Sequence, residues 1–226
     1  MNFIPYDQVK PLAEGYSRNL IPTFPLYVNG RQTALLVLGE APGKQEDKTG
    51  EPFVGWSGQL LRTAYIDYWE LQDHADVFLS NAVRCRPPGN RTPKPKEIKA
   101  HADMLAHDIA ELQSVYSEVF VLCAGAVACQ ALGMAKTLTA AFKNQGVVLP
   151  FAVGKVRAFC TFHPASLADR GKKRRHGPTR ARTDKGPALE AHLSLLKRAL
   201  SGEDPSPEPV QSNTCSWLIA PELPND

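Results

Sequence analysis

The chain has 226 residues, of which 43% are hydrophobic and 22% are charged, and its formal net charge at pH 7 is +3. This composition is typical of a globular protein, and the length allows a complete hydrophobic core without disulfide bonds. No apolar run approaches the roughly 18 residues that span a membrane, and the first ten residues lack the basic and apolar regions of a signal peptide. We therefore expect a cytoplasmic, monomeric protein without a membrane partner, folded as one domain over residues 1–200.

Buried strands and amphipathic helices alternate along the chain. Short apolar runs rich in Val, Leu and Phe predict strands at 34–39, 76–83, 118–125 and 156–162. Helical patterns are found at 57–71 with Ser57 as N-cap, at 96–116, at 125–133 ending with Gly133, and at 186–200. This alternation predicts an α/β fold with three αβα layers, in which helices flank a central four-stranded parallel sheet.

Two segments depart from this pattern. Residues 168–187 hold eight Lys or Arg against two Asp. Such a charge run is most often a solvated loop, but beside a site it favours a polyanionic partner. Residues 201–226 are polar and Pro-rich, which predicts a disordered tail.

The five cysteines do not indicate a metal site. None of them forms a C-x-x-C pair, and no His completes a zinc spacing. Cys123 and Cys160 lie inside apolar runs, so we expect them to be buried, reduced thiols. The sequence therefore predicts no metal ligands.

The polar motifs of the sequence stand at the ends of the predicted strands. They are, in chain order, GEAPG, RCRPPGNR, AGAVA and HPASL. Ligands of parallel sheets bind beyond the carboxyl ends of the strands. We therefore expect these four loops to meet at one rim and to form a single site.

The stretch LGEAPGKQED does not fit a nucleotide-binding loop. A phosphate loop has the pattern G-x-x-x-x-G-K-[ST], but Gly39 and Gly43 are one residue too close together. Gln45 also replaces the hydroxyl residue, and Pro42 removes a backbone amide. The dinucleotide pattern G-x-G-x-x-G is absent. A metal hydrolase is a further alternative. Its metal ligands would be Glu40, Glu46, Asp47 and His163, whose spacing allows such a site but does not require it.

Three motifs together resemble family 4 of the uracil-DNA glycosylase superfamily. They are GEAPGKQEDKTGEPFVGWSGQLL, NAVRCRPPGNRTP and HPASL, and the similarity spans residues 34–170. The resemblance implies a monofunctional hydrolase that flips a base out of single- or double-stranded DNA and hydrolyses its N-glycosidic bond. Its default substrate would be uracil, and its product an abasic site in DNA repair.

The resemblance implies three catalytic residues. Glu40 matches the acid that positions the water and faces the cationic sugar. His163 matches the donor to the base O2, where negative charge develops during bond cleavage. Asn81 matches the amide that reads the base edge, since an amide offers both a donor and an acceptor. Taken singly, these residues would have ordinary structural interpretations, such as a capping carboxylate or a surface His.

Further positions are expected to contact the base or the DNA. Phe53 matches the aromatic residue on which the flipped base stacks, Glu46 the acid beside the C5 side of the base, and Gly39 and Ala41 other parts of the pocket. Leu167 matches the side chain that fills the gap left by the flipped base. The expected DNA-binding residues are Asn90, Arg84, Arg86, Arg91, Ser166, Leu167, Lys172, Lys173, Arg174 and Arg175. Asn90 also suits a Pro-Gly-Asn turn.

The sequence departs from the family in its cysteines. Most members carry a four-cysteine iron–sulfur cluster, with a C-x-x-C before the first strand. Residues 1–33 contain no Cys, Cys85 fits a third ligand, and the fourth position falls near His101. One thiolate cannot hold the cluster, so no iron–sulfur cofactor is predicted. The N-terminal segment is expected to pack instead through Phe3, Ile4, Leu12 and Tyr16.

The basic segment after the HPASL motif is longer than is typical of the family. This difference is compatible with an alternative function: a glycosylase that removes another modified pyrimidine, such as a hypermodified bacteriophage cytosine, in antiphage defence. A non-catalytic DNA-binding module with the same fold is a further alternative. KKRRHG also resembles an arginine-rich loop of a superfamily branch that traps DNA covalently through His, but that branch carries its loop elsewhere in the chain. By this resemblance, His176 would be the residue that bonds covalently to DNA.

Overall fold

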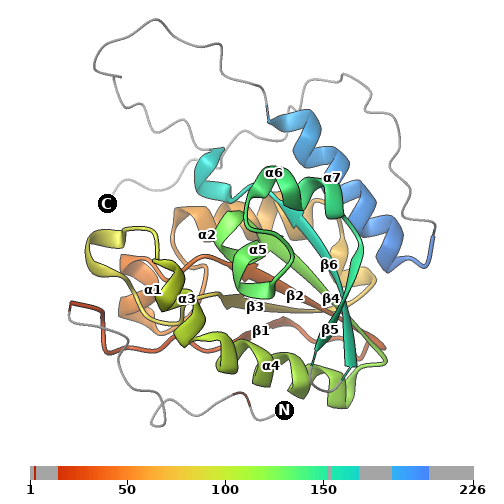
Figure 1. The fold of residues 1–226 in the computed structure, drawn as a ribbon. Coiled ribbons are helices and arrows are strands. Elements are labelled where there is room, and N and C mark those ends of the chain that lie inside the picture. The colour runs from red at the N-terminus through yellow and green to blue at the C-terminus, as the bar shows by residue number, and fades with distance from the viewer. Residues whose placement is uncertain (1–2, 4–14, 152–153, 168–184, 204–226) are drawn as a thin grey trace, which may run out of the picture.

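The computed structural model describes residue 3 and residues 15–151, 154–167 and 185–203. Within these residues the chain forms one six-stranded sheet with the order β1-β3-β2-β4-β6-β5 (Figure 1). The strands are β1 (Phe24–Tyr27), β2 (Thr33–Gly39), β3 (Asp76–Asn81), β4 (Glu118–Ala124), β5 (Val147–Phe151) and β6 (Gly154–Thr161). The central strands β3, β2, β4 and β6 are parallel, as predicted.

The sheet is larger than the four strands expected, because an antiparallel strand covers each edge. β1 pairs with β3 and β5 pairs with β6. Both edge strands contain a proline, Pro25 and Pro150, and their residues are only partly buried or exposed. Proline cannot donate to a sheet ladder and is tolerated at edges. Both strands are apolar in sequence, FPLY and VVLPF, but the proline in each argues against a central strand.

The α-helices are α1 (Lys44–Thr49), α2 (Trp56–Leu60), α3 (Pro95–Ala100), α4 (Ala102–Val115), α5 (Ala126–Leu132), α6 (Leu138–Ala141) and α7 (Gly186–Leu200). A π-helical turn at Leu61–Asp67 continues α2, and short 3₁₀ turns lie at Leu71–Asp73, Pro88–Asn90, Phe142–Asn144 and Pro164–Ser166. α5 ends before Gly133 in the left-handed conformation and α7 spans the predicted 186–200, so both predictions are confirmed.

Two helix predictions need correction. α2 begins at Trp56 with Gly55 as the N-cap, so Ser57 lies inside the helix instead of capping it. The predicted helix at 96–116 is two helices, because the backbone of His101 leaves the helical conformation between α3 and α4. The His101 side chain is buried and its Nδ1 accepts a hydrogen bond from the Arg84 amide, which directs the ring inward at the break.

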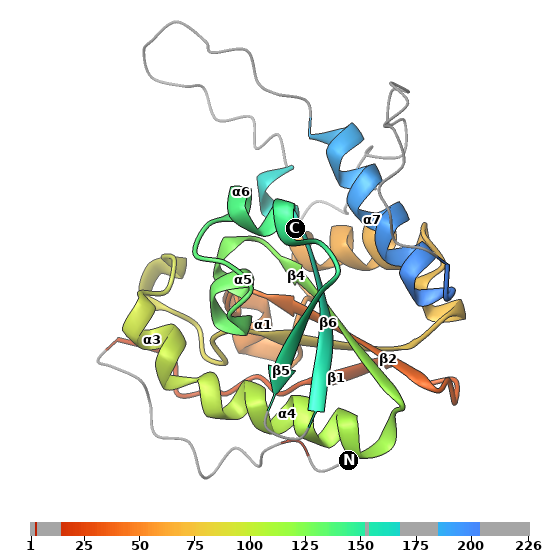
Figure 2. The ribbon, with the colours of Figure 1, turned by 45° about the vertical axis from the view of Figure 1, so that its right-hand side comes forward.

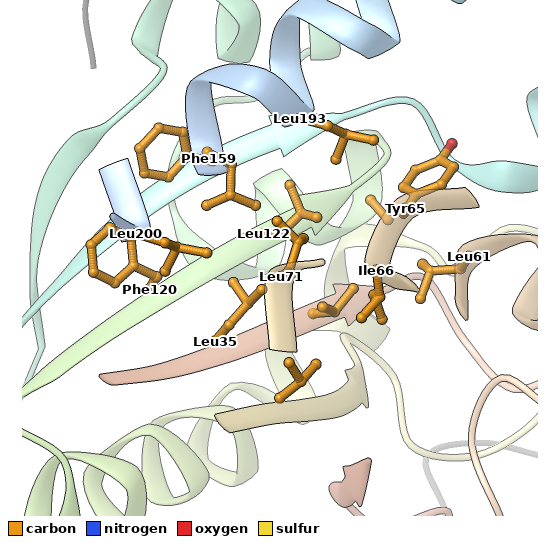
Figure 3. Packing of buried hydrophobic residues seen from close by; sticks show 14 of the residues in the cluster. Leu35, Leu61, Tyr65, Ile66, Leu71, Phe120, Leu122, Phe159, Leu193 and Leu200 are labelled. Carbon is orange, nitrogen blue, oxygen red and sulfur yellow. The ribbon is translucent and has the colours of Figure 1, made fainter. Parts of the chain in front are cut away.

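Helices cover both faces of the sheet. Figures 1 and 2 show α4 along one face and α7 along the other. Alternate residues of β2 pack into two hydrophobic cores, one on each face of the sheet. Leu35 and Val37 lie on the side of α7, and Leu36 and Leu38 on the side of α4. Figure 3 shows the first core, in which Leu193 of α7 lies over the aliphatic and aromatic side chains of the sheet. This two-sided burial explains why the central strands read as unbroken apolar runs.

Several predictions concern residues outside the described part. These are Ile4 and Leu12, residues 168–184 with their Lys and Arg, His176, and the tail from residue 204 onward. In the described part, Phe3 packs edge-on against Phe78 and Tyr16 is buried, as expected. Cys123 and Cys160 are buried free thiols. None of the helices described is both long enough and apolar enough to span a membrane.

Candidate active site

The parallel register brings the ends of the central strands side by side. Gly39, the last residue of β2, is paired with Asn81, the last residue of β3. Ala124 at the end of β4 is likewise paired with Thr161 at the end of β6. The four polar motifs therefore all follow the carboxyl-terminal ends of the central strands, on the same side of the sheet, as the sequence predicted.

Gly39, Phe53 and Asn81 form one close-packed surface. A methyl group added to Gly39 would lie 2.5 Å from Cζ of Phe53 and 2.6 Å from Oδ1 of Asn81. The Phe53 ring and the Asn81 amide therefore both lie against Gly39, which has no side chain. Asn81 is only 5% exposed and Phe53 only 6% exposed. An aromatic face beside an amide suits a planar, hydrogen-bonding ligand.

Phe53 holds this position through an unusual backbone conformation. Its φ of 57° lies in the left-handed region, which bulky residues seldom adopt. A Cβ atom on Gly58 would lie 2.1 Å from the carbonyl carbon of Phe53, so only glycine at 58 lets the chain fold this closely. Backbone strain of this kind is concentrated at functional sites.

Glu40 follows Gly39 and is only partly buried. Burial raises the pKa of its carboxyl group, and a hydrogen bond from the Thr92 side chain opposes that rise. Its backbone is held at the carbonyl, which accepts a hydrogen bond from the Val83 amide at 3.1 Å. The loops after β2 and β3 therefore meet at Glu40.

Glu46 fixes the loop that carries Glu40. Its Oε2 accepts a hydrogen bond from the Gly43 amide at 3.1 Å, and its Oε1 accepts one from the Gly55 amide at 2.8 Å. The buried carboxylate thus joins the start of α1 to the segment that leads from Phe53 into α2. Glu46 therefore has a structural role in this loop, and its contact with a base stays a prediction. Ala41 lies half-buried in the same loop.

The contacts of His163 fix its proton. Nδ1 accepts a hydrogen bond from the Ala165 amide at 3.2 Å, so in the neutral ring the proton is on Nε2. Gly125 lies against it, because a Cβ atom there would be 3.0 Å from the His163 Cβ. The Tyr65 hydroxyl donates to the Phe162 carbonyl at 2.9 Å and fixes the adjacent peptide. His163 is therefore a positioned Nε2–H donor.

Arg84 does not lie where the sequence placed it. Its side chain is 2% exposed, and its guanidinium donates to Asp108 and to the Thr23 hydroxyl. A buried arginine that is paired in this way cannot reach a DNA phosphate. The sequence could not reveal this, because the partner Asp108 comes from α4.

Arg86, Asn90 and Arg91 lie on the loop between β3 and α3. Arg86 Nε donates to the Asn90 side chain, and Asn90 has a φ of 55°, which fits the Pro-Gly-Asn turn. Arg91 makes two hydrogen bonds, at 2.8 and 2.9 Å, to the buried carboxylate of Glu97. Arg86 and Arg91 are both partly exposed, so their contact with DNA stays a prediction.

Ser166 and Leu167 close the HPASL motif. Ser166 is exposed, whereas Leu167 is half-buried and packs against the core on the α7 side. Insertion of Leu167 into DNA is therefore still a prediction. Lys185, just before α7, donates from Nζ to the Ser166 carbonyl at 3.3 Å and lies 5.1 Å from the centre of the Phe162 ring. This places one cation of the basic segment beside the motif.

The sequence analysis did not identify Thr92, Gly125 or Tyr65 as residues of the candidate site. Thr92 lies inside the second motif, and Gly125 follows the third strand, but only their contacts with Glu40 and His163 mark them as parts of the site. Tyr65 comes from the π-helical turn, a geometry that is frequent at functional sites. Nothing in the spacing of these residues predicts the contacts.

The donor set near Cys85 does not fit a four-thiolate iron–sulfur cluster. Cys85 Sγ lies 3.9 Å from Nε2 of His101, and Leu20 pairs with Cys85 across an isolated bridge. Nδ1 of His101 accepts the Arg84 amide, so its Nε2–H points to the sulfur, and burial lowers the His101 pKa to about 4. Among the residues described, no group of three or more His, Cys, Asp or Glu could hold a metal ion. The absence of a cluster stays a prediction.

Comparisons with known proteins agree with these motifs. Residues 25–197 match the family model described as "Uracil DNA glycosylase superfamily". A type-4 uracil-DNA glycosylase of Thermotoga maritima is 37% identical over 136 residues, which are 60% of this chain and 66% of that protein. Proteins of the same name from Archaeoglobus fulgidus and Pyrobaculum aerophilum are each 31% identical, over 65% and 67% of this chain and 73% and 74% of their own lengths.

Proposed function

Because this chain belongs to the uracil-DNA glycosylase superfamily, we propose that it is a monofunctional DNA glycosylase whose principal substrate is uracil in DNA. It would flip the nucleotide out of the strand, cleave the bond between the base and deoxyribose, and leave an abasic site. The names of the relatives, all type-4 uracil-DNA glycosylases, support uracil as the base.

One structural observation carries the proposal: the His163 ring is oriented by the hydrogen bond that its Nδ1 accepts from the Ala165 amide. His163 is held with Nδ1 as an acceptor, so the remaining ring nitrogen can donate to the O2 atom of a departing base. That atom gains negative charge as the glycosidic bond breaks. A fixed donor at such a position is worth about 3–4 kcal/mol of transition-state stabilisation.

Glu40 supplies the opposite charge. When the C1′–N bond breaks, its electron pair leaves with the base and the sugar becomes cationic. An ionised carboxylate facing the sugar stabilises this cation and orients the water whose oxygen then bonds to C1′. The partial burial of Glu40 strengthens its electrostatic effect, because there is less water to screen it.

Asn81 and Phe53 would select and hold the base. The Asn81 amide can donate to the uracil O4 atom and accept from N3–H, whereas cytosine offers the reverse pattern at these positions. Base stacking on an aromatic ring contributes about 1–3 kcal/mol. The absence of a side chain at Gly39 leaves Phe53 and Asn81 close together over one surface.

The proposal is tested by incubating the protein with single- and double-stranded DNA that contains uracil, hypoxanthine, hydroxymethyluracil or glycosylated hydroxymethylcytosine. Alkaline cleavage at abasic sites then reports base release. We expect release of uracil. Release of only another base would redirect the proposal to that base, and no release from any substrate would overturn it.

Two variants test the assigned roles. Glu40→Gln and His163→Ala are each expected to lower kcat for base release by about 100-fold or more while DNA affinity changes little. Glu118→Gln and His107→Ala are matched controls, because both side chains are exposed and lie on β4 and α4 away from the motifs. Anisotropy of labelled DNA measures binding. Equal losses in a variant and its control would contradict the assignment.

A further inference from the structure

A buried tyrosine outside the sequence motifs contacts the chain next to the proposed O2 donor. Tyr65 is 0% exposed, and its hydroxyl donates a hydrogen bond to the Phe162 carbonyl at 2.9 Å. The two residues are 97 positions apart in the sequence. In Figure 3 the Tyr65 hydroxyl lies beside the chain that leaves β6. The hydroxyl therefore joins the helical segment after Phe53 to the residue that precedes His163.

The position of Tyr65 is set by the turn that carries it. Residues Leu61–Asp67 form a π-helical continuation of α2, in which the Tyr68 amide donates to the Thr63 carbonyl at 2.9 Å. A π turn is wider than an α turn, so it rotates the side chains that follow α2, and such turns are frequent at functional sites. The Tyr65 ring packs in the core on the α7 side. Its hydroxyl is therefore held in one direction.

The hydrogen bond holds the peptide unit that leads into His163. Because a peptide is planar, the Phe162 carbonyl and the His163 nitrogen and Cα lie in one plane. A hydrogen bond at this carbonyl therefore fixes the orientation of the His163 backbone. The Phe162 ring is held as well, since its centre lies 5.0 Å from that of Phe142 and 5.8 Å from that of His192. Both the main chain and the side chain of Phe162 are thus anchored.

One helical segment supports both sides of the proposed base site. α2 begins at Trp56, just after Phe53, and its Gly58 lies directly against the Phe53 carbonyl group, where a Cβ atom would be 2.1 Å away. α2 also packs against the 3₁₀ turn Pro164–Ser166 of the HPASL motif. Tyr65 extends this support to the residue before the motif. The segment therefore fixes the position of the Phe53 backbone relative to the motif.

We propose that Tyr65 is a positioning residue for the glycosylase reaction, because its hydroxyl holds the Phe162–His163 peptide and so orients the His163 ring. The inference rests on the proposed function, which makes His163 the donor to the base O2 atom. Tyr65 is fully buried and acts only through His163. Loss of its hydroxyl should therefore slow cleavage of the glycosidic bond and leave DNA binding unchanged.

The test removes the hydroxyl with Tyr65→Phe, which keeps the buried ring. We expect the single-turnover rate constant for uracil release to fall about tenfold, because a displacement of about 1 Å in a catalytic group can cost up to about 100-fold. The dissociation constant for DNA should stay within about twofold. In a His163→Ala background, Tyr65→Phe should lower the rate by less than about twofold further, since the residue through which it acts is gone. An undiminished loss in that background would overturn the inference.

Tyr116→Phe is the matched control. Tyr116 is a buried tyrosine whose hydroxyl donates to Asp76 at 3.0 Å, and Asp76 is the first residue of β3, at the opposite end of the sheet from the motifs. This variant also loses one buried hydrogen bond, so it reproduces the loss of stability without a contact to the HPASL motif. Its rate constant should stay within about twofold of the wild type. An equal fall in both variants would show a general effect on stability and contradict the proposal.

Nuclear magnetic resonance reports on the surroundings of the His163 ring directly. Its Cε1–H and Cδ2–H signals, assigned with His163→Ala, should shift in Tyr65→Phe and stay unchanged in Tyr116→Phe. Unchanged signals in Tyr65→Phe would overturn the inference whatever the rate. If the wild-type protein releases no base, the proposed function fails, and the resonance measurement alone decides whether Tyr65 positions His163.

Discussion

Among single residues, the arrangement of Gly39, Phe53 and Asn81 depends on positions where a side chain would not fit. Residue 58 must be glycine, because a Cβ atom there would overlap the Phe53 backbone. Phe53 itself has a left-handed φ. Such conformations cost on the order of 1–3 kcal/mol each. The buried Phe53 ring, which packs in the core on the α7 side, offsets this cost.

Gly39→Ala is the sharpest test of this arrangement. The added methyl would overlap both Cζ of Phe53 and Oδ1 of Asn81, so the ring and the amide must move. We expect a loss of about 1–3 kcal/mol in the free energy of unfolding. We also expect a fall of at least tenfold in kcat/KM for base release, because displacements of 1 Å misplace the substrate.

Urea unfolding and base-release kinetics measure the two effects of Gly39→Ala. Gly154→Ala is the control, because its methyl would meet only the flexible end of the Gln113 side chain, at the far end of β6. Wild-type kcat/KM in Gly39→Ala would show that the base does not bind over this surface.

At the scale of elements, residues 15–21 hold the loop after β3 in place. The Ser17 amide donates to the Arg86 carbonyl at 3.1 Å and the Ile21 amide to the Arg84 carbonyl at 2.7 Å. Tyr16 adds its hydrogen bond to the buried Glu97. Hydrogen bonds therefore tie residues 15–21 to Arg84 and Arg86, the two residues that flank Cys85.

Tyr16→Phe and Glu97→Gln measure the strength of this attachment. We expect Tyr16→Phe to cost about 1 kcal/mol and Glu97→Gln about 1–3 kcal/mol of unfolding free energy at pH 7. In a double-mutant cycle the two losses should not add fully, since Tyr16 donates to the same carboxylate that Glu97→Gln neutralises. Additive losses in urea unfolding would contradict the pairing.

The effect of Glu97→Gln should depend on pH. Hydrogen bonds from Arg91 lead in lowering the Glu97 pKa to about 2. A carboxyl whose pKa is depressed in the folded state stabilises it above the unfolded pKa, and this stability is lost as pH falls from about 4.5 towards 2. The difference between Glu97→Gln and the wild type should therefore shrink over that range. A constant difference would show that the charge of Glu97 is not involved.

At the scale of the whole molecule, charge is unevenly distributed. The net charge is only +3, yet residues 168–187 hold eight Lys or Arg against two Asp. This segment follows the HPASL motif in the chain, and Lys185 at its end lies beside Ser166. A basic segment that leaves the rim at this point suits contact with DNA phosphates.

Neutralising Lys172, Lys173, Arg174 and Arg175 together, each to Gln, should weaken DNA binding because fewer counterions are released from the DNA. We expect the slope of log K against log salt to become shallower, by up to about 0.7–0.9 for each phosphate that the variant no longer neutralises. The fall in affinity should be largest at low salt, and kcat for bound substrate should stay within about twofold. Neutralising Lys96, Lys99, Lys143 and Lys155, which are exposed on other parts of the surface, is the control. An unchanged slope would contradict a role in DNA binding.

The central parallel sheet and the helices α5 and α7 could be predicted from the amino-acid sequence, and so could the motif residues. Continuous apolar runs mark strands buried on both faces, and a glycine such as Gly133 ends a helix by local conformation alone. The edge strands β1 and β5 were not predicted, because the proline in each argues against a buried central strand. Glu40, Asn81 and His163 were assigned because the motifs that contain them resemble those of the family.

The contacts of these side chains could not be predicted from the sequence, because they depend on the packing of distant segments. Arg84 carries the same charge as Arg86, but Asp108 from α4 draws it into the interior, while Arg86 stays near the surface. Thr92 meets Glu40, and Gly125 meets His163, across loops from different strands. Local sequence fixes backbone conformation and burial pattern. Contacts between residues far apart in the chain arise only when the sheet aligns the strand ends, and these contacts form the surroundings of the proposed catalytic groups.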